Sequence, residues 1–542
     1  MKIRKSNFIN GILSLFISQI LIKIFGIMYS IYMTNKSGFG DSGNAIYMSG
    51  YQIYALLLTV SSIGVPNAIS KMISEKKAIK DSLNADRIFK ISIFLFSIIG
   101  CVGSIILYIF SDFISIHILE IPETSLSLKV LSPAIFFVSI NSVFKGYFNG
   151  INKIYITAKT QFYEQVYKSI LTILLLEIFS SISNNNIEVM ASVANFATTI
   201  ATCFSLIYIM KKYKEENYTN NIEKNYYPKE NLKEIVKKVL VIAIPMTLNA
   251  ILSSFGKNVD SVTIVRILKD IIGEENAIRK YGIISSKIDI LISVPLAFNA
   301  SISTALIPEI ASLKNKNDID GIVRKIEFSI LITLMLGIPY AFGLFSYSNK
   351  IFALLFPNAS EGDKLLKIAA FGVIFSMLTQ TINAILQGLG KNKIPVYASF
   401  WGIILKVFFN IVLLPIEGIY EKGAIISNII SNFSSFIIVY FILIRNFDIK
   451  IKFLSLSTTP IFSSIIMIKF SLFINELLLK NKINNNFSTL ISIGFAVLLY
   501  GTGLFVMKML KNIINRQRLE NTGLLKVKTL EILKNKEKIL KK

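Results

Sequence analysis

Charged residues inside long apolar segments are the features of this sequence whose types and positions could do chemistry. An ionised side chain at membrane depth is costly, so it usually faces a partner or a polar cavity. The candidates to line a substrate cavity are Lys23, Lys257, Asp260, Arg266, Lys287 and Asp289. The candidates for a gate or a structural ion pair are Lys71, Glu164 and Lys168. Lys406 and Lys469 also lie within apolar segments.

The spacing of these residues predicts which of them can meet. Asp260 follows Lys257 at i+3 and Lys168 follows Glu164 at i+4, so each pair can share a helix face. Lys71 lies near the end of its segment and could instead extend to the membrane surface. A surplus of lysine and arginine suits an anionic ligand such as a phosphate or pyrophosphate. An exporter of small cations would be expected to present bare carboxylates.

Metal and nucleotide chemistry find little support in the sequence. The single histidine, His117, has no Cys or His partner at ligand spacing, so we expect no metal site. The Gly-x-Gly-x-x-Gly pattern at 38–43 lies in a short connection with no strand before it. We therefore expect no cofactor and no enzymatic activity. Energy for any transport must come from an ion gradient, the membrane potential or substrate flux.

Long apolar blocks must position these charged residues. Of the 542 residues, 53% are hydrophobic and 17% are charged, against about 25% charged in a soluble domain. Blocks such as 91–110 and 487–507 can each cross a hydrocarbon core of about 30 Å as a helix. The apolar blocks and polar breaks predict an all-α polytopic membrane protein with about fourteen transmembrane helices.

Lysine and arginine gather on one side of the predicted spans. The formal net charge is +25, yet the predicted outer loops at 111–126 and 179–187 contain neither residue. With a cytoplasmic N-terminus, this asymmetry follows the positive-inside rule and explains the basic composition without a nucleic-acid partner. Abundant Ile, Asn and Lys are typical of an AT-rich bacterial genome. We expect a multi-pass protein of the bacterial cytoplasmic membrane with both termini in the cytoplasm.

The predicted spans divide the chain into five parts. We expect an N-terminal six-helix lobe at 1–213, a cytoplasmic linker at 214–236, a second six-helix lobe at 237–446, transmembrane helices 13 and 14 at 447–508, and a basic cytoplasmic tail at 509–542. Apolar residues within 524–533 fit either an amphipathic helix on the anionic inner leaflet or a solvated tail.

The two six-helix lobes resemble each other in sequence. Residues 66–70 match residues 308–312 at the ends of corresponding spans, and residues 150–154 match residues 390–394 further on. An even number of spans in each copy makes the repeat parallel, with its axis along the membrane normal. Two such lobes can enclose a cleft and expose it to each side in turn by rocking.

Several segments are similar to one known family. They are residues 23–29, 43–54, 64–71, 260–268 and 304–308. They resemble the stage V sporulation protein B and YtgP group, with its MurJ-like members, in the multidrug/oligosaccharidyl-lipid/polysaccharide (MOP) flippase superfamily.

This resemblance implies two lobes around a cationic cavity, a final helix pair, and flipping of lipid-linked oligosaccharide precursors. It also implies that Lys23, Asp260, Arg266 and Asp289 line or gate the cavity. The chain departs from the family pattern at Ser30, where many relatives have arginine. It departs again at Ile290, where MurJ-like members have arginine.

Three functions remain open at this point. The first is a flippase for a peptidoglycan precursor (lipid II), with a role in sporulation or in vegetative wall synthesis. Its partners would be a lipid-linked anionic oligosaccharide and membrane lipids, with Na⁺ or H⁺ as candidate coupling ions. The alternative is a multidrug or small-molecule cation antiporter of the MATE type, although such relatives usually have twelve spans. The third is a membrane scaffold without transport.

Overall fold

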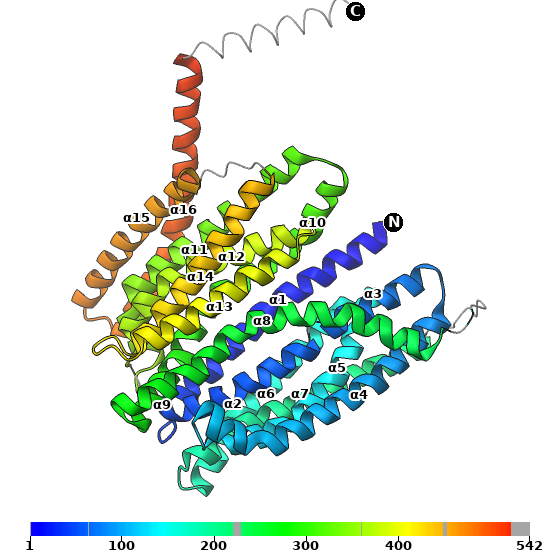
Figure 1. Cartoon of the computed structure of the whole chain (residues 1–542). Helices are drawn as coiled ribbons and strands as arrows, with labels where there is room; N and C mark the ends of the chain where they lie inside the picture. The colour runs from blue at the N-terminus through cyan, green and yellow to red at the C-terminus, as the bar shows by residue number, and fades with distance from the viewer. Residues whose placement is uncertain are drawn as a thin grey trace, which may run out of the picture.

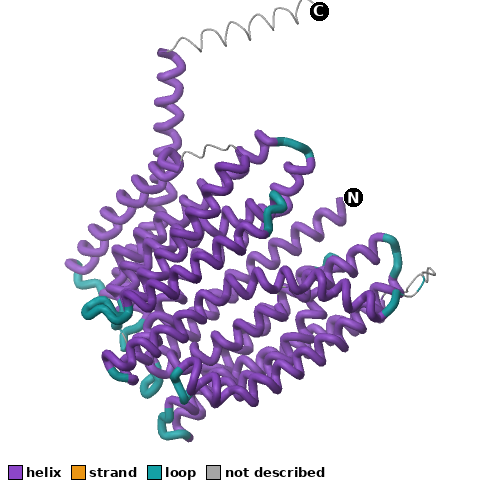
Figure 2. Tube along the Cα trace, viewed as in Figure 1, coloured by secondary structure: helices purple, strands orange, loops and turns teal. Residues whose placement is uncertain are grey.

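The computed structural model consists of helices joined by short loops in the part of the chain that it describes, which Figures 1 and 2 show. The described residues are 2–62, 64–219, 228, 230–358, 360–447 and 453–521. Among them, 12 helical segments are long and apolar enough to cross a membrane. Together with α1 (Lys2–Asn35) and α8 (Leu232–Ile272), which are 34 and 41 residues long, they make the predicted number. The all-α polytopic fold is therefore confirmed.

The first lobe begins with α1. Its second span consists of α2 and α3, and its third ends in a π-helical turn, η1. The remaining bounds are α2 (Gly40–Ser62), α3 (Gly64–Ala78), α4 (Ser82–Phe113), η1 (Ile114–Leu119), α5 (Thr124–Gly150), α6 (Ile154–Ile182) and α7 (Ile187–Thr219).

The second lobe begins with α8, and its second span contains the π-helical turn η2. The bounds are α9 (Glu274–Gly282), η2 (Ile283–Ile288), α10 (Asp289–Asn315), α11 (Ile319–Leu355), α12 (Asp363–Gly388), α13 (Lys393–Leu413) and α14 (Glu421–Phe447). The last pair, α15 (Phe453–Lys480) and α16 (Asn485–Asn521), packs against α11.

The packing of the helices repeats between the two lobes, as the sequence predicts. The contacts α1–α6, α4–α5, α5–α7 and α6–α7 correspond to α8–α13, α11–α12, α12–α14 and α13–α14. Asp81 caps α4 by accepting from the amide of Asn84, and Asp318 caps α11 in the same way. A glycine of each fourth span, Gly146 or Gly388, lies directly against the backbone of the second span.

The helices extend beyond the predicted bounds of the linker and the tail. α7 continues to Thr219 and α8 begins at Leu232, so both enter the predicted linker. A Lys212–Glu215 ion pair of 2.6 Å stabilises the exposed end of α7. α16 continues to Asn521, past the predicted end of the fourteenth span at 508. The predicted amphipathic segment at 524–533 lies outside the described residues.

α8 crosses from one lobe to the other and lies between the two groups of helices in Figure 1. Near its start, Ile235 and Val239 are buried in the apolar core of the first lobe, together with Ile69. Its later part contacts α13 of the second lobe. The first span of the second lobe therefore also completes the packing of the first lobe.

Candidate functional site

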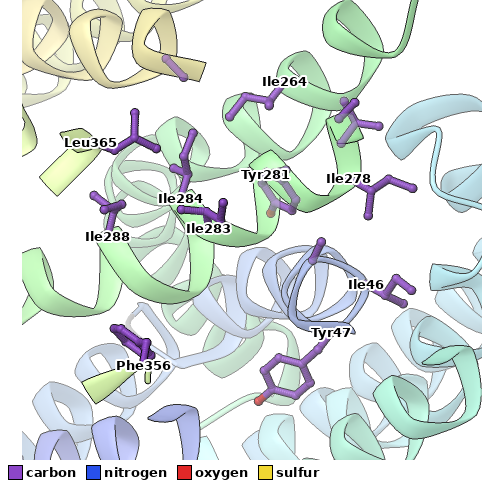
Figure 3. Packing of buried hydrophobic residues seen from close by; sticks show 14 of the residues in the cluster. Ile46, Tyr47, Ile264, Ile278, Tyr281, Ile283, Ile284, Ile288, Phe356 and Leu365 are labelled. Atoms are coloured by element: carbon purple, nitrogen blue, oxygen red, sulfur yellow. The ribbon is translucent and has the colours of Figure 1, made fainter. Parts of the chain in front are cut away.

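The two lobes meet through an apolar core near the ends of the helices that lie opposite to the N-terminus. This end carries the α1–α2 and α11–α12 connections and is called the outer end, after the predicted orientation. Figure 3 shows Ile46 of α2 near Ile278 of α9 and Tyr281 of α9 facing α2, whereas Tyr47 points to the other side of α2. All four side chains are buried. Gly282 is close enough to α2 that a Cβ atom would lie 2.0 Å from the carbonyl oxygen of Asp41.

A buried ion pair joins the lobes beside this core. Lys287 of η2 is fully buried, and its Nζ lies 2.7 Å from Oδ1 and 2.9 Å from Oδ2 of Asp41 on α2. The Nδ2 atom of Asn358 donates to the backbone oxygen of Asn35 at 2.9 Å. We call Asp41, Lys287, Asn35 and Asn358 the outer lock. Its interactions hold the two lobes together at the outer end.

Two acidic residues at the outer end each form ion pairs with two basic residues. Glu361 contacts Arg279 and lies 2.6 Å from Lys280. Glu120 of the first lobe lies 2.6 Å from Arg266 of α8 and also contacts Lys269. Burial pushes the pKa of Glu361 upward, but the hydrogen bond and charge of Lys280 and the charge of Arg279 hold it below its ordinary value.

The same balance applies to Glu120. Burial raises its pKa, and the hydrogen bonds and charges of Lys269 and Arg266 bring it below the ordinary value of a glutamate. Both carboxylates are therefore ionised at neutral pH.

A cavity of about 350 Å³ lies inside the second lobe, between α8, α10, α12, α13 and α14. Asp260 and Asp289 both line it, so the structure brings two of the predicted cavity residues together. Asp260 is buried, and its Oδ2 lies 2.7 Å from Nζ of Lys406. Asn410 and Asn428 donate to the same carboxylate at 3.3 and 3.1 Å. The acidic charge of Asp260 is thereby neutralised inside the lobe.

The first lobe has a different arrangement of charges around α6. The expected Glu164–Lys168 pair is not formed, which corrects that prediction. Glu164 lies 3.7 Å from Lys145 of α5 and accepts from Ser205 of α7 at 3.0 Å. Lys168 instead lies among tyrosine rings, and its Nζ is 3.7 Å from the ring centroid of Tyr51. Neighbouring helices thus supply closer partners than the i+4 position does.

The remaining predicted residues lie in three places. Lys23 is half-buried on α1 and donates to Ser293 of α10 at 3.4 Å, so it lies where the lobes face each other. Arg266 and Lys287 are at the outer end, in contacts between helices, and neither lines the cavity.

Lys71 is exposed on α3, and its Nζ lies 4.0 Å from the carboxylate of Glu75. The backbone of Lys257 is part of α8, but its side chain lies outside what the structure describes.

Sequence reasoning missed several residues of these sites. Asp41, Asn358 and Glu361 lie in or beside short connections and carry no hydrophobic signal. Lys406 was visible as a lysine within an apolar span, but its partner Asp260 is 146 residues away in the chain. The sequence indicated the Lys406–Asp260 pair only in that two opposite charges lie in different spans of one lobe.

Comparisons with known proteins agree with this geometry. Residues 8–314 match the family model described as polysaccharide biosynthesis protein, and residues 245–412 match the MatE family model. The uncharacterized membrane protein YabM of Bacillus subtilis is 25% identical over 76% of this chain and 75% of its own length. The lipid II flippase MurJ of Bacillus subtilis is 23% identical over 82% of each chain.

Among solved structures, lipid II flippase MurJ in an inward closed conformation superposes with a TM-score of 0.69 and 18% identity. The superposition covers 92% of this chain and 99% of that structure, and it supports the fold. The first family model alone spans more than half of the sequence. The chain therefore belongs to the polysaccharide biosynthesis protein family within the MOP superfamily of flippases.

Proposed function

We propose that this protein flips a lipid-linked oligosaccharide across the bacterial cytoplasmic membrane by alternating access, without enzymatic chemistry. The observation that carries the proposal is the outer lock. A buried Lys287–Asp41 pair of 2.7 Å and an apolar core join the lobes at the outer end of the helices that carry them. The proposed substrate is a peptidoglycan precursor (lipid II), since a relative of similar length is named as a lipid II flippase.

The chain offers basic groups for an anionic head group where the lobes face each other. Lys23 extends from α1 of the first lobe to Ser293 of α10 in the second. Rocking of the lobes would separate this contact on the cytoplasmic side and the outer lock on the other. With both termini in the cytoplasm, the head group would enter from the inner face and leave outward.

The last helix pair fits a substrate with a lipid tail. α15 and α16 pack on each other and on α11, and leave the rest of their surfaces for lipid. Phe462, Phe470 and Phe473 are more than half exposed on α15. A polyprenyl chain could follow this surface while the head group crosses between the lobes. Na⁺ and H⁺ both remain candidate coupling ions.

The second candidate function is a small-molecule cation antiporter of the MATE type. The cavity that contains Asp260 and Asp289 favours it, and the MatE model matches residues 245–412. The Lys406–Asp260 pair weighs against it, because the ammonium already neutralises that carboxylate. Drug efflux from proteoliposomes that is abolished by Asp289→Asn would support the antiporter.

The proposed function can be tested by rescue of a bacterial strain depleted of its lipid II flippases. We expect the full chain to restore growth and to prevent cytoplasmic accumulation of lipid II. Lys23→Ala is expected to impair rescue, whereas Lys71→Ala, at an exposed surface lysine, should not. Membrane insertion at normal levels with unchanged lipid II accumulation would contradict the proposal.

A further inference from the structure

Each lobe contains a buried lysine on its fifth spanning helix. Lys168 of α6 is 5% exposed, and Lys406 of α13 is 3% exposed. In the second lobe, the carboxylate of Asp260 neutralises Lys406 at 2.7 Å. In the first lobe, Lys168 lies among aromatic rings and not beside a carboxylate. This difference between the two buried lysines points to a ligand.

Tyrosine rings surround the Lys168 ammonium. Its Nζ lies 3.7 Å from the ring centroid of Tyr51, 5.5 Å from that of Tyr29 and 5.9 Å from that of Tyr47. We call Lys168 and these three tyrosines the tyrosine box. Within the described part of the chain, no carboxylate lies at ion-pair distance from Lys168. The nearest acidic residue on the same helix face, Glu164, is engaged by Lys145.

The tyrosine box therefore has a net positive charge inside the lobe. A buried ion is strongly disfavoured unless a counter-charge and hydrogen bonds compensate it. The faces of aromatic rings attract a cation, but they supply no negative charge. A bound anion would provide the missing compensation. Lysine and tyrosine hydroxyls are suitable donors for phosphate oxygens.

The tyrosine box lies partly on helices that contact the second lobe. These contacts would change if the lobes separated during transport. Tyr29 belongs to α1, which contacts α10 of the second lobe, and Tyr51 belongs to α2, which contacts α8, α9 and η2. Both tyrosines are only half-buried. Lys23, six residues before Tyr29 on α1, reaches Ser293 of α10 at the interface. Separation of the lobes along α1 and α2 would thus give an anion a route from Lys23 to Lys168.

We propose that the tyrosine box binds the pyrophosphate group of the lipid-linked substrate, with Lys168 as its central cation. The inference rests on the proposed function and deepens it, because it names the residue that anchors the substrate's negative charge. Lys406 has no such role, since Asp260 already neutralises it. The lobes thus have separate tasks: the first recognises the anion, and the second keeps its buried charges paired.

The test is binding of a sugar-free polyprenyl pyrophosphate to the full chain in nanodiscs. We expect Lys168→Gln to weaken binding at least tenfold, and Lys168→Arg to weaken it less than threefold because the charge remains. Lys71→Gln, which removes an exposed lysine, is the matched control and should bind like the wild type. Phosphatidylglycerol should bind equally to the wild type and to Lys168→Gln.

The outcomes separate the inference from the proposed function. Folded Lys168→Gln protein that binds polyprenyl pyrophosphate like the wild type overturns the inference and leaves the flippase proposal standing. An equal loss of phosphatidylglycerol binding also overturns it, because the site would then recognise anionic lipids in general. A wild-type protein that binds no polyprenyl pyrophosphate contradicts the proposed function itself.

A second measurement uses the wild-type sequence, in case Lys168→Gln does not fold. The protein is labelled with 3-fluorotyrosine, and the resonance of Tyr51 is assigned by its loss in Tyr51→Phe. We expect polyprenyl pyrophosphate to shift this resonance and polyprenol to leave it unchanged. The same spectrum with both lipids would overturn the inference.

Discussion

Replacement of Lys287 by methionine should open the outer end of the protein. Lys287 is fully buried, and Asp41 would keep its charge after the ammonium has been removed. Breaking a buried pair from one side typically costs about 3–5 kcal/mol, because the remaining ion is uncompensated. Even the lower value corresponds to about a hundredfold shift at roughly 1.4 kcal/mol per factor of ten. The shift favours states in which Asp41 reaches water.

The assay is a distance measurement between spin labels on the two lobes. Labels at Ser37 and Ser360 would lie on opposite sides of the outer lock, in a background in which Cys101 and Cys203 are replaced by alanine. We expect Lys287→Met to convert a single short distance into a distribution dominated by longer ones. Lys71→Met, which removes an exposed lysine, should leave the distances unchanged.

A double variant makes the test more specific. Asp41→Asn together with Lys287→Met removes both charges, so it should recover part of the short-distance population. An unchanged distribution in folded Lys287→Met protein would refute the idea that this pair holds the lobes together. A double variant as open as Lys287→Met alone would show that the effect comes from lost packing rather than from the uncompensated carboxylate.

Three further predictions concern the same contacts. Gly282→Ala should also increase the distances between the spin labels, because the added Cβ would lie 2.0 Å from the backbone oxygen of Asp41. Such overpacking typically costs about 1–3 kcal/mol. Unchanged distances would argue against this close contact. Lys406→Met should lower the thermal unfolding temperature more than Asp260→Asn/Lys406→Met does, since the single variant leaves a buried carboxylate uncompensated; equal losses would contradict the pair's role. The lowered pKa of Glu361 means that its ion pairs with Arg279 and Lys280, which join the α11–α12 connection to α9 within the second lobe, are present at neutral pH and are lost as the pH falls below the ordinary glutamate value of about 4.3; Glu361→Gln should remove the acid-induced loosening of this connection, measured as the mobility of a spin label at Ser360.

The architecture was readable from the sequence because its signals are local. Hydropathy marks each span within about 20 residues, and the motif pairs at 66–70 and 308–312 show the duplication. Helix ends were less predictable. α7 and α8 continue into the polar linker because capping and side-chain pairs stabilise helix beyond the apolar segment.

The ion pairs were not readable, because their partners lie far apart in the chain. Lys287 and Asp41 are separated by 246 residues, and the apolar pattern around each predicts depth but not a partner. The i+4 spacing of Glu164 and Lys168 suggested a pair, yet Lys145 and Tyr51 come closer from other helices. Tertiary contacts therefore decided which predicted charges line the cavity and which join the lobes.

Translocation in proteoliposomes tests alternating access most directly. A pyrophosphate-linked lipid oligosaccharide with a fluorescent head group would be followed by quenching from outside. Asn35→Cys and Asn358→Cys, in the background without native cysteines, place a disulfide across the outer lock, where these residues are hydrogen-bonded. We expect the protein to translocate the lipid when reduced, to stop when oxidised, and to resume on reduction. Translocation that continues in the cross-linked protein would contradict the account.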